Sequence, residues 1–132
     1  MTLSSLLFSS EADIEKKIYT LIIHSVFPTK QEIKIWTDDS KKMSLLNKIS
    51  SVKLIKDPGN ADLLIVKNSL KTPSQALIFT STYRALEHHE DKAIGGFYWQ
   101  KGRPNILFLE PNLKKHHIIL PNSMDEYLES SL

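Results

Sequence analysis

The sequence contains no cysteine, and this absence excludes several kinds of chemistry. Without thiols the chain can form no disulfide, thiolate zinc site or iron–sulfur cluster, and it has no cysteine nucleophile. A glycine-rich phosphate loop, a GxSxG motif and an HExxH motif are also missing, so nucleotide hydrolysis, serine esterase and zinc-protease chemistry have no sequence support. The lack of thiols does not indicate a compartment.

Long apolar runs and an excess of charge are missing as well. No stretch approaches the roughly 18 apolar residues of a membrane-spanning helix. Seventeen basic and fifteen acidic residues leave a formal net charge of +2, which is too small to favour nucleic-acid binding. What is present is 132 residues with 41% hydrophobic side chains, enough for one domain with a substantial core.

The first twelve residues differ in composition from the rest. Leu3, Leu6, Leu7 and Phe8 lie among serines, and small residues follow before a charged run. This pattern is typical of the end of a secretory signal peptide, although the basic amino-terminal part is missing. We therefore interpret residues 1–12 as a signal-peptide remnant or a disordered start.

A long amphipathic helix is expected over residues 10–26. Ser9 or Ser10 can cap it, and Pro28 ends it. The apolar stripe at helical spacing consists of Ile14, Ile18, Leu21, Ile22 and Val26. Residues 32–37 alternate polar and apolar, as in a strand with one buried face. A helix over 41–49 follows, and its buried side would be formed by Met43, Leu45, Leu46 and Ile49.

Strands and helices continue to alternate in the rest of the chain. Residues 62–66 and 76–80 are apolar runs typical of inner strands, and the polar residues 69–75 between them predict a loop. The remaining expected elements are a strand at 52–55, helices at 81–89 and from 111, a hairpin of strands 94–100 and 105–109 with Gly102 in the turn, and a last helix capped by Asn122 or Ser123 and ending at 128. This order predicts one α/β domain over residues 13–132, with a mixed, mostly parallel sheet flanked by helices and an antiparallel hairpin near the C-terminus.

Asp38 and Asp39 follow a predicted strand, where an acidic pair can hold Mg²⁺. Phosphoacceptor receiver domains carry such a pair, together with an aspartate after the central strand, a Thr or Ser, and a Lys. Thr80 and Lys101 could serve as the last two, but the central strand ends in Lys67-Asn68 and offers no aspartate. A degenerate receiver-like scaffold, with a fully parallel five-stranded sheet, remains an alternative. The simpler interpretation is that the acidic pair caps the next helix.

Hydroxyl groups gather between the strand 76–80 and the helix that follows it. Thr80, Ser81 and Thr82, together with Tyr83 or Arg84, would line a cleft at strand ends, which is the usual ligand position in an open α/β sheet. The alternative is an ordinary helix N-cap. A small-ligand sensor module is therefore our second functional hypothesis.

Two pairs of adjacent histidines, at 88–89 and 116–117, are also present. Neighbours on a helix point in different directions, so neither pair is a local chelate and we expect no metal site.

The expected hairpin combines aromatic residues in its first strand with cationic residues around its turn. Phe97, Tyr98 and Trp99 precede Lys101 and Arg103. Alternation along a strand places either Tyr98 or the Phe97/Trp99 pair on the outside. Such residues can pack against a helix, stack nucleic-acid bases or bind a protein partner. The low net charge disfavours nucleic acid, so we take these five residues as candidates for partner contact.

Several of these segments together resemble the YfiR-like family of small periplasmic regulators. The similarity lies in the strand 76–80, the glycine-led strand Ile94-Gly95-Gly96-Phe97, the hairpin Gln100-Lys101-Gly102-Arg103 with Phe108, the pair Asn112-Leu113, the closing segment to Leu128, and an opening helix that ends in Val26-Phe27-Pro28. These are packing motifs, and they extend over most of residues 13–128.

The resemblance implies a periplasmic α/β protein that has no catalytic residues and no cofactor. Such a protein would bind the periplasmic sensor portion of a membrane-bound signalling protein, for example a diguanylate cyclase or a sensor kinase. A homodimer remains open. Two departures matter: characterised members use disulfides, and Phe27 stands where the family has a tryptophan before proline.

Overall fold

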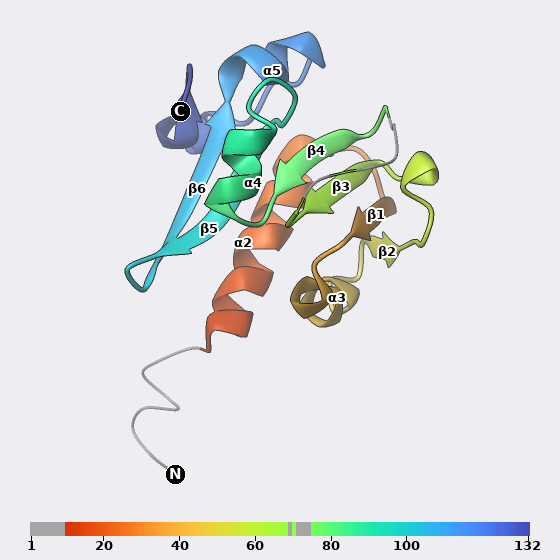
Figure 1. Cartoon of the computed structure of the whole chain (residues 1–132). Coiled ribbons are helices and arrows are strands. Elements are labelled where there is room, and N and C mark those ends of the chain that lie inside the picture. Colours follow the sequence, from red (N-terminus) through yellow and green to blue (C-terminus); the bar gives the residue numbers. More distant parts are fainter. Residues whose placement is uncertain (1–9, 69, 71–74) are drawn as a thin grey trace.

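A mixed β-sheet forms the centre of the computed structural model, which describes residues 10–68, 70 and 75–132. Within these residues seven strands pair in the order β2-β1-β3-β4-β5-β6-β7 (Figure 1). The strands are β1 (Ile33–Thr37), β2 (Val52–Leu54), β3 (Leu63–Val66), β4 (Leu77–Thr80), β5 (Gly95–Gln100), β6 (Arg103–Leu109) and β7 (Leu128–Glu129). Neighbours from β2 to β5 are parallel, β6 is antiparallel to β5, and β7 is parallel to β6.

This sheet confirms the predicted α/β class with a terminal antiparallel hairpin. It also excludes the receiver-like alternative, which required a sheet of five strands that are all parallel. The part of the sheet formed by β2-β1-β3-β4-β5 has the strand order of a flavodoxin-like sheet. The loop expected at 69–75 and most of the segment 1–12 lie outside the described residues. Of that first segment, Ser10 caps helix α2 and residues 11–12 begin it.

Helices cover both faces of the sheet. Helices α2 (Glu11–Val26) and α3 (Ser40–Asn47) pack on one face, where the larger core includes Ile23, Leu46 and Phe79. The short helix α4 (Tyr83–His88) lies on the other face, over β4 and β5, with Leu86 buried beneath it (Figure 1). Helix α5 (Glu110–Lys115) and the 3₁₀ helices η1 (Pro58–Asn60) and η2 (Asn122–Tyr127) complete the described elements. None of the described helices has the length and apolarity to cross a membrane.

The buried side of α2 differs from the expected stripe. Leu21 is 47% exposed, whereas Tyr19 and Ile23 are fully buried beside Ile22. The helix is rotated because the buried side also includes Glu15, which hydrogen-bonds to residues of α3 and β5. Met43 of α3 was likewise expected inside and is 44% exposed.

The end of the chain also differs from its prediction. The expected last helix is the 3₁₀ helix η2, and neither Asn122 nor Ser123 provides a side-chain cap. Pro121 occupies the N-cap position and offers no side-chain acceptor for the first N–H groups. The chain then becomes extended at Leu128 and adds β7 beside Phe108 of β6.

Gly95 permits the close pairing of β5 and β6, so Gly95→Ala should weaken the hairpin. A Cβ atom there would clash with the backbone oxygen of Leu107, which cannot move without shifting β6. We expect a loss of about 3 kcal/mol in the free energy of unfolding, at the upper end of overpacking effects. Chemical denaturation measures the loss. Gly59→Ala is the control, because its Cβ would meet only the Asp57 side chain. Equal losses in the two variants would contradict the assignment.

Candidate functional site

The β5–β6 hairpin directs its aromatic side chains to opposite sides of the sheet. Phe97 is 1% exposed, and its ring centroid lies 5.4 Å from that of Tyr19 in α2. Trp99 is partly buried on the same side, where its indole Nε1 donates a hydrogen bond of 2.7 Å to Glu15 Oε1. Phe97 is therefore inaccessible to a partner, contrary to our expectation, and Trp99 serves mainly to bind α2 to the hairpin. The alternation leaves Tyr98 on the other side.

Tyr98 forms an aromatic pair with Tyr83, a residue that was not among the predicted partner contacts. The ring centroids lie 5.1 Å apart at an interplanar angle of 63°, an edge-to-face arrangement. Tyr83 comes from the first turn of α4 and is 41% exposed. Burial, and to a lesser extent the neighbouring Tyr83, raise the pKa of Tyr98 above its usual value. With Trp99 and Gln100 the pair lines a hollow of about 370 Å³.

Two cationic side chains lie at the tip of the hairpin. Lys101 and Gly102 have φ angles of 52° and 74°, so both central residues of the turn are left-handed, as a type I′ turn requires. Lys101 and Arg103 are exposed, and neither forms an ion pair with any other residue that the structure describes. Of the predicted partner set, only these two cations are exposed, whereas Tyr98 is half-buried on the adjacent strand.

A buried ion pair connects the hairpin to the helices behind it. Lys42 Nζ of α3 lies 2.7 Å from Glu15 Oε1, the oxygen that also accepts the Trp99 indole N–H. The Glu15 side chain is only 10% exposed. Tyr19 lies one turn further along α2 with its hydroxyl buried and unpartnered among the described residues, and burial together with the Glu15 and Asp39 charges raises its pKa well above the usual value. This cluster determines how α2, α3 and β5 are placed relative to one another.

Asp38 and Asp39 bind parts of the chain itself at the carboxyl edge of the sheet. The two Asp38 oxygens accept the backbone N–H groups of Lys67 and Asn68 at 2.6 and 3.0 Å. Asp39 caps α3 through the Lys41 N–H and accepts a 2.9 Å hydrogen bond from the buried Ser81 hydroxyl. The capping interpretation of this pair is therefore confirmed for Asp39. In the described part of the chain no group of three or more His, Cys, Asp or Glu could hold a metal ion.

The predicted ligand hydroxyls are also engaged within the fold. Thr80 is fully buried and donates to the Gly95 oxygen at 3.4 Å. Thr82 caps α4 by accepting the Ala85 N–H, and its hydroxyl donates to the Lys67 oxygen at 3.1 Å. Together with Ser81 on Asp39, these residues link strand ends to one another and do not line a cleft, which corrects three of the four predicted ligand residues.

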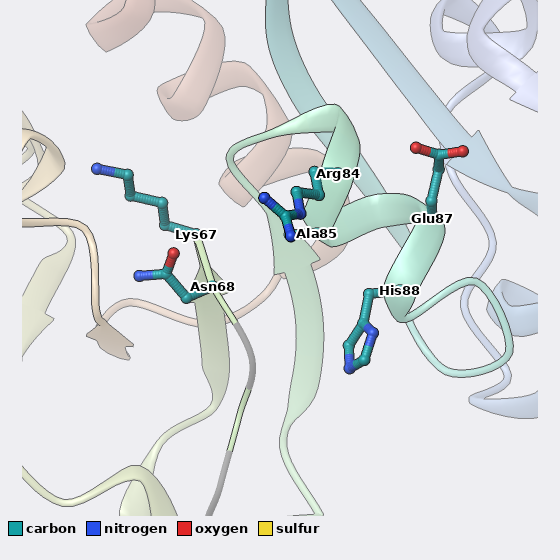
Figure 2. Close-up of a pocket in the computed structure, with 6 residues that line it drawn as sticks. All are labelled: Lys67, Asn68, Arg84, Ala85, Glu87 and His88. Atoms are coloured by element: carbon teal, nitrogen blue, oxygen red, sulfur yellow. The ribbon is translucent and has the colours of Figure 1, made fainter.

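Arg84, the fourth predicted ligand residue, does line a groove. The groove lies between the end of β3 and α4 and has a volume of about 640 Å³ (Figure 2). Its lining residues are Lys67, Asn68, Arg84, Ala85, Glu87 and His88. Figure 2 shows the Arg84 guanidinium extending toward Lys67 and Asn68, whereas the Glu87 carboxylate extends away from them. We call these residues the α4 groove.

The adjacent histidines at the C-terminal end of α4, His88 and the C-cap residue His89, have different surroundings. His88 is exposed and lines the α4 groove, whereas His89 is 8% exposed, and its Nε2 has no hydrogen-bond partner among the described residues. The two rings meet edge to face with centroids 4.8 Å apart. Burial, followed by the charge of His88, lowers the pKa of His89; a hydrogen bond with the Asn68 backbone acts in the opposite direction.

The buried ion pair predicts a specific non-additivity. Lys42→Met leaves the Glu15 carboxylate buried without its cation and should lower the free energy of unfolding by about 3 kcal/mol. The double variant Glu15→Gln/Lys42→Met removes both charges and keeps an acceptor for Trp99, so it should lose much less. Denaturation in urea measures both, with the exposed neighbour variant Lys41→Met as control. A double variant that loses as much stability as Lys42→Met alone would contradict the assignment.

The lowered pKa of His89 predicts a pH dependence of stability. The unfolded chain binds the His89 proton near the ordinary value of 6.5, and the folded chain binds it only at lower pH. Unfolding therefore takes up a proton, and the folded state loses stability as the pH falls through 6.5. Denaturation series between about pH 7.5 and about pH 5 should show a steeper loss for the parent protein than for His89→Gln. The exposed His116→Gln serves as control and should follow the parent; parallel curves for all three would contradict the prediction.

Comparison with known proteins assigns no family to this chain. No protein-family model, curated protein or solved structure matches it. The resemblance to the YfiR-like family therefore stays a prediction from the sequence. Two features of the geometry remain on which a function can be built: the exposed side of the hairpin and the α4 groove.

Proposed function

We propose that this chain is a non-catalytic regulatory protein that binds a protein partner through the exposed side of its β5–β6 hairpin. The observation that carries the proposal is the Tyr83–Tyr98 pair beside two unpaired cations, Lys101 and Arg103. We call these four residues the hairpin face. Tyrosine and arginine supply much of the binding energy in protein interfaces, and tyrosine does so at low conformational entropy cost.

The shape of the hairpin supports this use. Strand β4 pairs with β5 only at Gly95 and Gly96, and β7 pairs with β6 only at Phe108 and Leu109. The rest of the hairpin therefore extends beyond its neighbouring strands, as Figure 1 shows. Projecting strands with open edges favour association with another chain. Pro104 limits pairing along β6, since it offers no N–H donor.

The rigidity of the hairpin also supports a binding role. Its inner side is held by Phe97 in the core and by the Trp99–Glu15 hydrogen bond. The tyrosine pair on the outer side is thus presented on a fixed support, and less conformational entropy is lost when a partner binds. The positive tip would suit an acidic surface on that partner.

Together with the sequence resemblance, these features favour one kind of partner. We propose the periplasmic portion of a membrane-bound signalling protein, such as a diguanylate cyclase or a sensor kinase, and a periplasmic location for this chain. The regulation would consist of binding alone, so it needs no cofactor.

Pull-down and titration against the purified periplasmic portion of such a signalling protein, encoded beside this chain, would test the proposal. We expect the parent to bind and Tyr98→Ala to weaken binding by about tenfold or more, because a buried interface tyrosine contributes about 2 kcal/mol. Arg103→Gln should weaken binding as well, mainly through a slower association rate.

Two control variants sharpen this test. Leu21→Ala removes an exposed apolar side chain from α2, and Arg84→Gln removes a positive charge outside the hairpin face; neither should change partner binding. If Tyr98→Ala keeps the affinity of the parent protein, the assignment of partner binding to the hairpin face is wrong. Self-association of the chain that Tyr98→Ala abolishes, without binding to the signalling protein, would assign the face to a homodimer instead. Residence in the cytosol would overturn the proposed location.

A further inference from the structure

The α4 groove carries two positive charges that the fold leaves unneutralised. Neither the Arg84 guanidinium nor Lys67 Nζ lies within ion-pair distance of a carboxylate in the parts of the chain that the structure describes. Among the lysines that the structure describes, only Lys30, Lys42 and Lys114 pair with an acidic residue. The acidic side chain closest in sequence, Glu87, is directed away from both cations (Figure 2).

The groove lies at the edge of the sheet where open α/β folds hold ligands. Lys67 and Asn68 follow β3, whose carboxyl end meets that of β4 at this edge. The strand order reverses at β1, so the neighbouring crevice between β1 and β3 is the switch point of the sheet. Asp38 already occupies the backbone N–H groups of Lys67 and Asn68 there. A ligand at this edge would therefore contact side chains in the α4 groove and not those amides.

From these observations we infer that the α4 groove binds a small organic molecule carrying a phosphate monoester. Arg84 offers a planar fork that matches two oxygens of such a group, and it extends across the groove toward the Lys67–Asn68 segment. Lys67 lines the opposite wall, with its ammonium directed away from Arg84 (Figure 2), and it adds positive charge to the rim of the groove. Asn68 and His88 provide further hydrogen-bonding groups. The volume of about 640 Å³ lies within the range of about 300–1,000 Å³ that is usual for small-molecule sites.

Isothermal titration with glycerol 3-phosphate tests the inference, with glycerol as the neutral match and succinate as a carboxylate dianion. We expect glycerol 3-phosphate to bind, succinate to bind more weakly and glycerol not to bind. Arg84→Gln should weaken the phosphate ester by about tenfold or more, the effect of losing a charge-assisted hydrogen bond, and Arg84→Lys should restore part of it.

Arg103→Gln is the matched control, because it removes the same charge from the exposed hairpin tip. Its affinity for the phosphate ester should equal that of the parent. Equal weakening by the two arginine variants would show general attraction to a basic surface and overturn the site. Binding of glycerol as strong as that of glycerol 3-phosphate, or the absence of any heat with all three compounds, would also overturn the proposed site. Thermal melting of each variant verifies that it is folded.

This inference stands apart from the proposed partner binding. Arg84→Gln should lose the phosphate ester and keep the protein partner, and Arg103→Gln should do the reverse. Failure of one proposal is thereby distinguishable from failure of the other.

Discussion

The hydrogen bond between the Trp99 indole and the Glu15 carboxylate decides which side of the hairpin faces outward. Side chains alternate along a strand, so binding Trp99 to α2 also directs Phe97 into the core and Tyr98 to the opposite side. Glu15 can remain buried because Lys42 neutralises it from α3. One partly buried cluster thus fixes the position of two helices and the orientation of the surface to which we assign a binding role.

Local patterns in the sequence predicted most of the elements but not the long-range polar contacts. The strand runs and the turn at Gly102 follow from neighbouring residues, and the structure confirms them. The face of α2 could not be predicted in the same way, since Leu21 has the spacing of a core residue. Its exposure depends on Glu15 reaching Trp99, which is 84 residues away in the sequence. Periodicity treats a glutamate as a surface residue and carries no information about such a partner.

The candidate sites show the same limit. Thr80, Ser81 and Thr82 have the composition of an anion site, but their partners Gly95, Asp39 and Lys67 come from other strands and use up the hydroxyl groups. Conversely, Lys67 and Arg84 are 17 positions apart and belong to no motif, yet the parallel pairing of β3 and β4 brings their segments to one edge. The signal available in the sequence was only that Lys67 directly follows one buried strand and that Arg84 lies in the first turn of the helix after the next one.

Helix α4 supports both proposed sites. Its first residue, Tyr83, belongs to the hairpin face, and the next residue, Arg84, belongs to the α4 groove. Ala85 and Leu86 anchor the helix on the sheet. Because Tyr83 and Arg84 are consecutive residues of one short helix, a displacement of α4 would move both of them. The two sites are therefore chemically separate, because one presents aromatic rings and the other presents unpaired charge, but they depend on the same short piece of backbone.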